Sequence, residues 1–285
     1  MLITPDFVLL NFPKTGSSFT RQVVKTVYGG SPGGRLKRGL AKAGLCEPPF
    51  RELFFPNIRL RVDGLQEDQH GTYRQIPGVF RRLPVVAVAR NPFDRYVSKY
   101  KFRYWQSRPI PSLEEVRRVF PGFPDLSFEQ FLDYEDFLSS RYRIPGLALN
   151  PTPGGQTVEF AMMFFTDPSG FLKAASGTGL DQDGLIKALP PIRFLRMERL
   201  NRDLYNFLED AGVSRRRIRF ILQTDRIQPP EGTSRKPGDR WQDYYSPALL
   251  EKVYRKDRIL FDLLGALGVG EPESWPGNRE TSGHG

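Results

Sequence analysis

Lys14, Gly16 and Ser17 lie in a short turn whose residue types could bind an anion. The turn follows the apolar run Phe7–Leu10 and precedes a helical pattern, so it joins a predicted strand to a predicted helix. Gly16 allows the backbone to approach a ligand closely, the first N–H groups of a helix lack partners within it, and Lys14 adds a positive charge. We therefore expect a phosphate group to bind at this turn.

The order of residues separates this turn from a Walker A loop, in which the lysine directly follows the last glycine. In this chain Lys14 precedes Gly16 by two residues. The alternative to a phosphate site is an ordinary connection between a strand and a helix that carries a good N-cap.

A second segment repeats the arrangement of a strand followed by a helix. Val85–Ala89 is a continuous apolar run, as expected for a parallel strand that is buried on both faces. Asn91 can cap a helix that begins at Pro92. Arg90, at the carboxyl end of the strand, and Ser98, two turns along the helix, could hold one phosphate between them. The alternative is that Arg90 pairs with a carboxylate and Ser98 faces solvent.

Together the two segments resemble the nucleotide-binding motifs of sulfotransferases of the carbohydrate and bacterial type, which use 3′-phosphoadenosine 5′-phosphosulfate (PAPS). In that family the first loop holds the 5′-phosphosulfate, and an Arg with a Ser eight residues later holds the 3′-phosphate. The resemblance spans most of residues 7–265 and implies PAPS as a co-substrate, without a metal. The residues implied in its binding are Lys14, Thr15, Gly16, Ser17, Ser18, Phe19, Arg90 and Ser98.

The resemblance also implies a reaction, the transfer of a sulfuryl group from PAPS to a hydroxyl or amine of an acceptor. Lys14 is expected to neutralise charge on the departing phosphate oxygen, and His70 to act as the general base. His70 is the only histidine outside the C-terminal tail, and similar sulfotransferases carry a His-x-Thr-Tyr-like segment here. The alternative is a surface histidine in a polar turn, in which case Glu67 or Asp68 would replace it.

A loop that closes over the nucleotide is expected at residues 233–238. Arg235 and Lys236 are basic, small residues surround them, and the loop comes just before the last predicted helix, as in the family. They could contact the 3′-phosphate or the adenine; the alternative is a solvated turn. A longer family form of this loop is only echoed here, in Gly238, Arg240 and Trp241.

The charge of the chain suggests affinity for polyanions, with a formal net charge of +10 and a pI near 9.8. The basic residues lie in scattered clusters without an RNP, zinc-finger or helix-turn-helix signature, so we expect no nucleic-acid partner. No stretch approaches the roughly 20 apolar residues of a membrane span, and no signal-peptide pattern occurs. We therefore expect a cytoplasmic protein. One cysteine, Cys46, and two histidines argue against a disulfide or a metal cluster of these residues.

The predicted fold class is α/β, with a P-loop-like three-layer arrangement in which helices flank a central, mostly parallel sheet. We expect a single domain over residues 1–267 and a disordered tail over 268–285. Beyond the segments above, strands are predicted at Ile58–Val62 and Pro191–Met197. Helices are predicted at Ser18–Tyr28, from Pro92 to about Trp105, at Ser127–Phe137, from Glu198 to about Ala211, and at Pro247–Leu267. Residues 35–56 show no clear period, and residues 144–157 resemble a loop.

Two other functions are compatible with these patterns. A P-loop kinase or NTPase on a related fold would explain the anion site at Lys14, although the Walker A order is missing. A non-catalytic polyanion-binding protein would explain the net charge. Tight binding of adenosine 3′,5′-bisphosphate without magnesium would argue against the first, and detectable sulfate transfer against the second.

Overall fold

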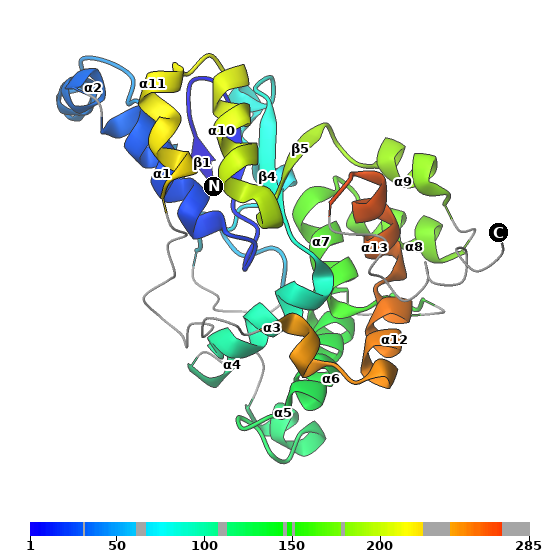
Figure 1. Cartoon of the computed structure of the whole chain (residues 1–285). Helices are drawn as coiled ribbons and strands as arrows, with labels where there is room; N and C mark the ends of the chain where they lie inside the picture. The colour runs from blue at the N-terminus through cyan, green and yellow to red at the C-terminus, as the bar shows by residue number, and fades with distance from the viewer. Residues whose placement is uncertain are drawn as a thin grey trace. The chain divides into compact units, whose positions relative to one another are not determined.

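A computed structural model of the chain describes residues 1–30, 32–60, 67–107, 113–144, 147–149, 152–177, 180–224 and 240–269 (Figure 1). The chain divides into two compact units, each built from separate stretches of sequence. Unit 1 comprises Met1–Asn57, Gln66–Ala89 and Pro191–Pro229. Unit 2 comprises Ile58–Leu65, Arg90–Pro190 and Pro230–Gly285. The single domain over residues 1–267 stays a prediction.

Five short strands of unit 1 form one mixed sheet in the order β3-β1-β2-β4-β5. The strands are β1 (Leu2–Ile3), β2 (Val8–Leu10), β3 (Arg51–Glu52), β4 (Val85–Ala89) and β5 (Ile192–Arg196). β2, β4 and β5 run parallel, whereas β1 pairs antiparallel with both β2 and β3. The α/β class is confirmed. The sheet is mixed, because the predicted parallel pairing extends only from β2 to β5.

The register of the parallel strands aligns their carboxyl ends at one edge of the sheet. Leu10 of β2 lies opposite Ala87 of β4, and Ala89 of β4 lies opposite Arg196 of β5. The loops that leave β2 and β4 therefore begin at the same edge, as expected for ligand sites in parallel sheets.

Helices and strands of unit 1 share one hydrophobic core. The described α-helices of this unit are α1 (Ser17–Gly29), α2 (Pro32–Lys42), α10 (Leu200–Asp210) and α11 (Arg215–Ile218). The helix predicted at Ser18–Tyr28 is confirmed as α1, and its apolar side chains Phe19, Val23, Val24 and Val27 are all buried in this core. Leu9, Val86 and Leu195 join it from the three parallel strands. Burial of these side chains fixes α1 and α10 against the sheet.

Unit 2 is helical in the part of the chain that the structure describes. Its α-helices are α3 (Pro92–Phe102), α4 (Tyr104–Ser107), α5 (Leu113–Val119), α6 (Phe128–Leu138), α7 (Gly155–Phe164), α8 (Pro168–Gly177), α9 (Gln182–Ala188), α12 (Pro247–Lys256) and α13 (Arg258–Ala266). The helix predicted at Ser127–Phe137 is confirmed as α6, and it begins with a capping box in which Ser127 and Gln130 hydrogen-bond to each other's backbone N–H. None of the described helices is long and apolar enough to cross a bilayer.

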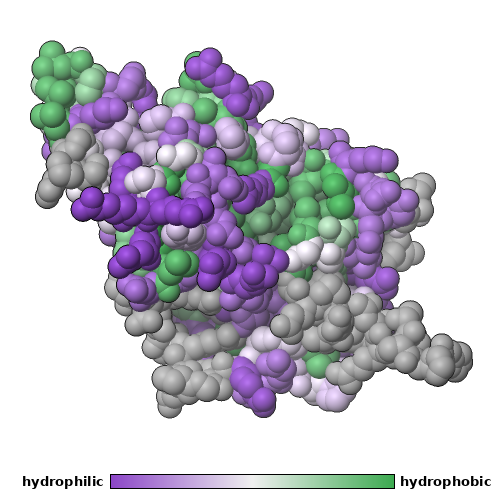
Figure 2. Space-filling view, turned by 45° about the horizontal axis from the view of Figure 1, so that its top comes forward, coloured by the Kyte–Doolittle hydropathy of each residue, from purple (hydrophilic) through white to green (hydrophobic). Residues whose placement is uncertain are grey.

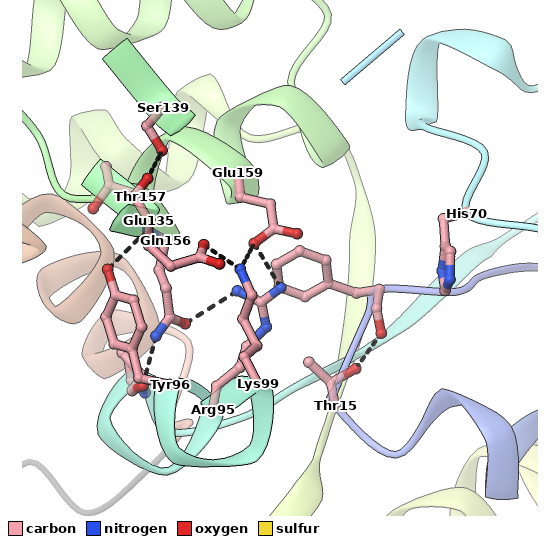
Figure 3. A network of polar contacts seen from close by, with 12 residues as sticks. Thr15, His70, Arg95, Tyr96, Lys99, Glu135, Ser139, Gln156, Thr157 and Glu159 are labelled. Atoms are coloured by element: carbon pink, nitrogen blue, oxygen red, sulfur yellow. Dashed lines mark hydrogen bonds and ion pairs between the residues drawn. The ribbon is translucent and has the colours of Figure 1, made fainter. Parts of the chain in front are cut away.

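A buried ion network joins α3, α6 and α7 inside unit 2 (Figure 3). Arg95 contacts Glu159 at 2.9 Å, and Lys99 contacts Glu159 at 3.0 Å and also Glu135. Arg143 lies 3.6 Å from Glu135. Burial opposes the ionisation of Glu159, but the surrounding charges, Arg95 and Lys99 foremost, hold its pKa well below the usual range. The cations are thus compensated within the unit.

Four sequence predictions differ from the observed elements. Residues 32–42 form α2, although residues 35–56 show no clear period in the sequence. Residues 58–60 form a turn, so the strand predicted at Ile58–Val62 is wrong there, and residues 61 and 62 lie outside the described part. The predicted loop over residues 144–157 ends early, because α7 begins at Gly155.

The fourth difference is a break in the last helix, which ends as α12 and restarts as α13 at Asp257. Asp257 is buried and accepts hydrogen bonds from the N–H and Oγ1 of Thr157, both at 2.8 Å, and from the Tyr96 hydroxyl at 2.8 Å. Burial raises the pKa of Asp257 to about 6, against the lowering effect of the Thr157 N–H. These contacts come from α7 and α3 and fix the break.

We predict that Asp257 makes the folded state less stable as the pH rises. Its carboxyl group keeps a proton up to about pH 6 in the folded state, whereas in the unfolded chain it loses the proton near pH 4. Between these values the folded state holds the extra proton, so the unfolding free energy falls with rising pH, by about 3 kcal/mol in all. Urea unfolding measures the unfolding free energies of the wild type and of Asp257→Asn. The wild-type value minus the variant value should fall with rising pH across this window and stay constant above it. A difference that is independent of pH would contradict the prediction.

Candidate functional site

The turn between β2 and α1 has an unusual backbone conformation. Lys14 and Gly16 both have positive φ angles, 65° and 90°. Such a conformation costs energy in a residue with a side chain, so at Lys14 the fold maintains a strained residue, as often occurs at ligand sites. Thr15 between them is fully buried, and its hydroxyl donates to the Phe12 carbonyl at 2.9 Å (Figure 3).

Gly16 is required by packing as well as by its φ angle. A Cβ atom at this position would lie 2.6 Å from Met197 Sδ and 2.8 Å from Leu200 Cδ2. The backbone at the start of α1 is therefore pressed against the beginning of α10. Gly16 is also the N-cap of α1, and it has no side chain that could accept from the first N–H groups of that helix. The alternative of a helix with a good side-chain N-cap is therefore not what the structure shows.

The remaining predicted residues of the turn differ in exposure. Ser18 is exposed, whereas Ser17 is buried and Lys14 is half-buried. Phe19 packs its ring into the core of unit 1, so only its backbone N–H can serve a ligand. The first turn of α1 contains no acidic residue that would oppose the positive end of the helix dipole. This end of α1, with Lys14, is suited to an anion.

His70 is attached to the same end of β2. Its Nδ1 lies 2.6 Å from the carbonyl oxygen of Asn11, the residue that follows β2. A carbonyl oxygen can only accept, so Nδ1 must carry the proton of the neutral ring and Nε2 the lone pair. Its backbone N–H donates to Asp68 Oδ1 at 2.7 Å. His70 is therefore a positioned, half-buried histidine with the tautomer that a base at Nε2 requires.

The two substitute bases are less suited to this role. Asp68 accepts from the His70 N–H and from the Asn57 side chain at 3.4 Å, so its carboxylate shapes the turn. Glu67 is exposed.

Asn11 offers a buried acceptor beside His70, and sequence reasoning missed it. Its Nδ2 donates to the Gln69 carbonyl at 3.2 Å, which fixes the orientation of the amide. Its Oδ1 is buried and accepts no hydrogen bond from the described residues. A buried acceptor without a donor costs about 1–3 kcal/mol. A polar residue directly after a buried strand is the signal that could have singled it out.

Arg90 and Ser98 belong to unit 2, where Arg90 directly precedes the N-cap of α3 and Ser98 lies within that helix. The predicted cap is confirmed, because the Asn91 side chain accepts from the N–H of Phe93 at 2.9 Å and Pro92 begins the helix. Arg90 pairs through Nε with Asp94 Oδ2 at 2.5 Å, so the predicted alternative, a pair with a carboxylate, is present. Ser98 is half-buried.

Arg95, placed by its spacing on the helix face of Asn91 and Ser98, serves the interior of unit 2. It is 1% exposed and donates to Gln156 at 3.1 Å in addition to its pair with Glu159 (Figure 3). Its role is therefore structural. Arg235 and Lys236 lie outside the described residues.

A second arginine at the sheet edge was missed by the sequence predictions. Arg196 ends β5, and Asp203 on α10 accepts from its Nε at 2.8 Å and from its Nη2 at 3.0 Å. Burial opposes ionisation of Asp203, but the hydrogen bonds from Arg196 lower its pKa. The pair connects the end of β5 to α10.

The comparisons with known proteins gave no match. No family model, no curated protein and no solved structure matches this chain. The resemblance to sulfotransferases therefore depends on the motifs themselves.

We predict that Gly16→Ala destabilises the protein more than an alanine at another glycine of positive φ. Gly212 has a φ of 82°, and a Cβ added there would have no atom within 4 Å, so Gly212→Ala should cost only the left-handed conformation, about 1–2 kcal/mol. Gly16→Ala adds the collision with Met197 and Leu200, about 1–3 kcal/mol more. Urea unfolding measures both variants. Equal losses would show that the packing at Gly16 is not tight.

Proposed function

We propose that this protein transfers a sulfuryl group from PAPS to a hydroxyl or amine of an acceptor. The observation that carries the proposal is the attachment of the Lys14–Ser18 turn and of His70 to the same end of β2, through the Asn11 carbonyl. An anion site and a base on one strand end are what transfer from a phosphosulfate requires. The family resemblance supplies the identity of the donor.

The first N–H groups of α1 would hold the 5′-phosphate of PAPS, together with Lys14. The acceptor oxygen or nitrogen forms a bond to sulfur while the bond between sulfur and the bridging oxygen breaks. The electron pair of that bond remains on the phosphate of adenosine 3′,5′-bisphosphate. The Lys14 ammonium stabilises the charge that develops there.

His70 would take the proton of the acceptor at Nε2. The Asn11 carbonyl fixes the ring through Nδ1, which places the lone pair of the neutral ring at Nε2. His70 would move a proton and leave the sulfur chemistry to the donor.

Arg90 and Ser98 would bind the 3′-phosphate, as the family motif implies. The Asp94 carboxylate competes with the phosphate for Arg90, because both are anionic partners of one guanidinium. The guanidinium has five N–H donors, and the pair with Asp94 engages Nε. A cytoplasmic location and the absence of a nucleic-acid partner remain parts of the proposal.

We predict that Lys14→Ala and His70→Ala separate binding from chemistry. Calorimetry without magnesium should show about 10- to 100-fold weaker binding of adenosine 3′,5′-bisphosphate to Lys14→Ala, since a charge-assisted contact is lost. His70→Ala should bind this nucleotide within about twofold of the wild type but lose about 10²- to 10⁴-fold in turnover of labelled PAPS. The acceptor for this assay comes from a screen of metabolite, saccharide and lipid fractions.

The matched control for Lys14 is Lys25→Ala, because Lys25 lies on α1 itself and pairs with Glu52. This variant should bind the nucleotide like the wild type. Equal nucleotide binding by Lys14→Ala and Lys25→Ala would contradict the assignment of the anion site to Lys14. Turnover of His70→Ala at the wild-type rate would contradict the assignment of His70 as the base.

We predict that Arg90→Ala and Asp94→Asn have opposite effects on the nucleotide. Arg90→Ala should weaken the binding of adenosine 3′,5′-bisphosphate by about tenfold or more. The binding of 5′-AMP, which lacks the 3′-phosphate, should stay within about twofold of the wild type. Asp94→Asn removes the competing charge and should retain or strengthen the binding of adenosine 3′,5′-bisphosphate. If Arg90 only anchors Asp94, both variants break one ion pair and should change binding alike, which would contradict the assignment.

A further inference from the structure

The helix α2 of unit 1 and the turn after it carry exposed leucines. Leu36, Leu40 and Leu45 are 65%, 37% and 72% exposed. In Figure 2 this helix, at the upper left of the view, shows hydrophobic surface next to hydrophilic surface. Leu36 and Leu40 are four residues apart and so share one face. Exposed leucines that gather on one element indicate an interaction surface.

The opposite face of α2 is turned to α1. The Arg38 guanidinium carbon lies 3.6 Å from where a Cβ on Gly29 would be, and Arg38 is about 200° around the helix from Leu36. The leucines therefore point away from the body of unit 1. Side chains 36–40 are all exposed, and so are those of residues 42–47.

The helix also lacks the means to be stable by itself. It has 11 residues, including Gly33, Gly34 and Gly39, and each glycine costs about 1 kcal/mol relative to alanine in a helix. Isolated helices of this length are marginal in water. Burial of the leucine face against another surface would stabilise it.

The charge around the leucines selects the kind of surface. Residues 29–46 contain no acidic residue, and Arg35, Lys37, Arg38 and Lys42 give the segment a formal charge of +4. A short helix with leucines on one face and basic residues around them is suited to the interface of an anionic bilayer. The leucines enter the boundary of the acyl chains while the lysines contact the headgroups.

We propose that α2 and the turn after it, residues 32–46, dock unit 1 on the surface of an anionic phospholipid bilayer. The helix lies in the plane of the interface and does not span it. This docking site is separate from the Lys14 turn and His70, and it holds whether or not the protein transfers sulfate.

Cys46 provides a probe at the end of this segment. It is exposed and is the only cysteine of the chain, so an environment-sensitive maleimide fluorophore labels this position alone. Vesicles of phosphatidylcholine and phosphatidylglycerol should shift its emission to the blue and protect it from iodide. Vesicles of phosphatidylcholine alone should have a much smaller effect, and added salt should reverse the binding. An equal response to both vesicles, or none to either, would overturn the proposal.

Variants of unlabelled protein test the two halves of the interaction by co-sedimentation with the same vesicles. Leu36→Gln with Leu40→Gln should weaken binding by about tenfold or more, and so should Lys37→Glu with Lys42→Glu. The matched control is Val79→Gln, because Val79 is 72% exposed and belongs to unit 1 but not to α2. An equal loss in the control would overturn the proposal. Light scattering gives a second test. If the wild type is a dimer and the leucine variant is a monomer, the leucines of α2 contact a second copy of the chain, and the proposal is overturned.

Discussion

The close packing of the Gly16 backbone against Met197 and Leu200 is the constraint on which the site of unit 1 depends. It sets the start of α1 directly beside the start of α10, and both helices then share one core over the parallel strands. Any side chain at position 16 would separate them. The chain passes from the end of β2 to the start of α1 within a few residues. It does so with positive φ angles at Lys14 and Gly16. The N–H groups of α1 are thereby brought to the sheet edge, where the Asn11 carbonyl holds His70.

The positive charge of the chain is divided among different tasks. In unit 2, the buried Arg95 and Arg143 and the half-buried Lys99 pair with Glu135 and Glu159 and hold three helices together. Removing one member of such a network leaves an uncompensated charge in the interior, so these residues serve the fold rather than a ligand. At the sheet edge Arg196 is likewise committed to Asp203. The charges suited to ligands are therefore fewer than the net charge suggests, and we place them at the turn after β2, at Arg90 and on α2.

Local features of the fold could be predicted from the sequence, because each depends on residues within one or two turns. The stripe of α1, the Asn91 cap before Pro92 and the capping box of Ser127 and Gln130 are of this kind. The turn at Lys14 was predicted from its residue types, and its strained backbone agrees with a special role. The helix α2 was missed because residues 35–56 show no clear period, and propensity within a short segment is a weak guide.

Features that depend on distant residues could not be predicted. The break at Asp257 is fixed by Thr157 and Tyr96, which are 100 and 161 residues away in the chain. The mixed character of the sheet depends on β1 and β3, which have two residues each and carry almost no pattern. The link between His70 and Asn11 spans 59 residues. In the candidate site, therefore, Lys14 and His70 could be singled out from the sequence, but the contact of His70 with Asn11 could not.

The most direct test of this account is a crystal structure of the protein with adenosine 3′,5′-bisphosphate. The account predicts that the 5′-phosphate lies at the first N–H groups of α1, within hydrogen-bond distance of the Gly16–Ser18 backbone and of the Lys14 ammonium. A nucleotide bound elsewhere, with the turn after β2 unchanged and in contact with water only, would contradict it.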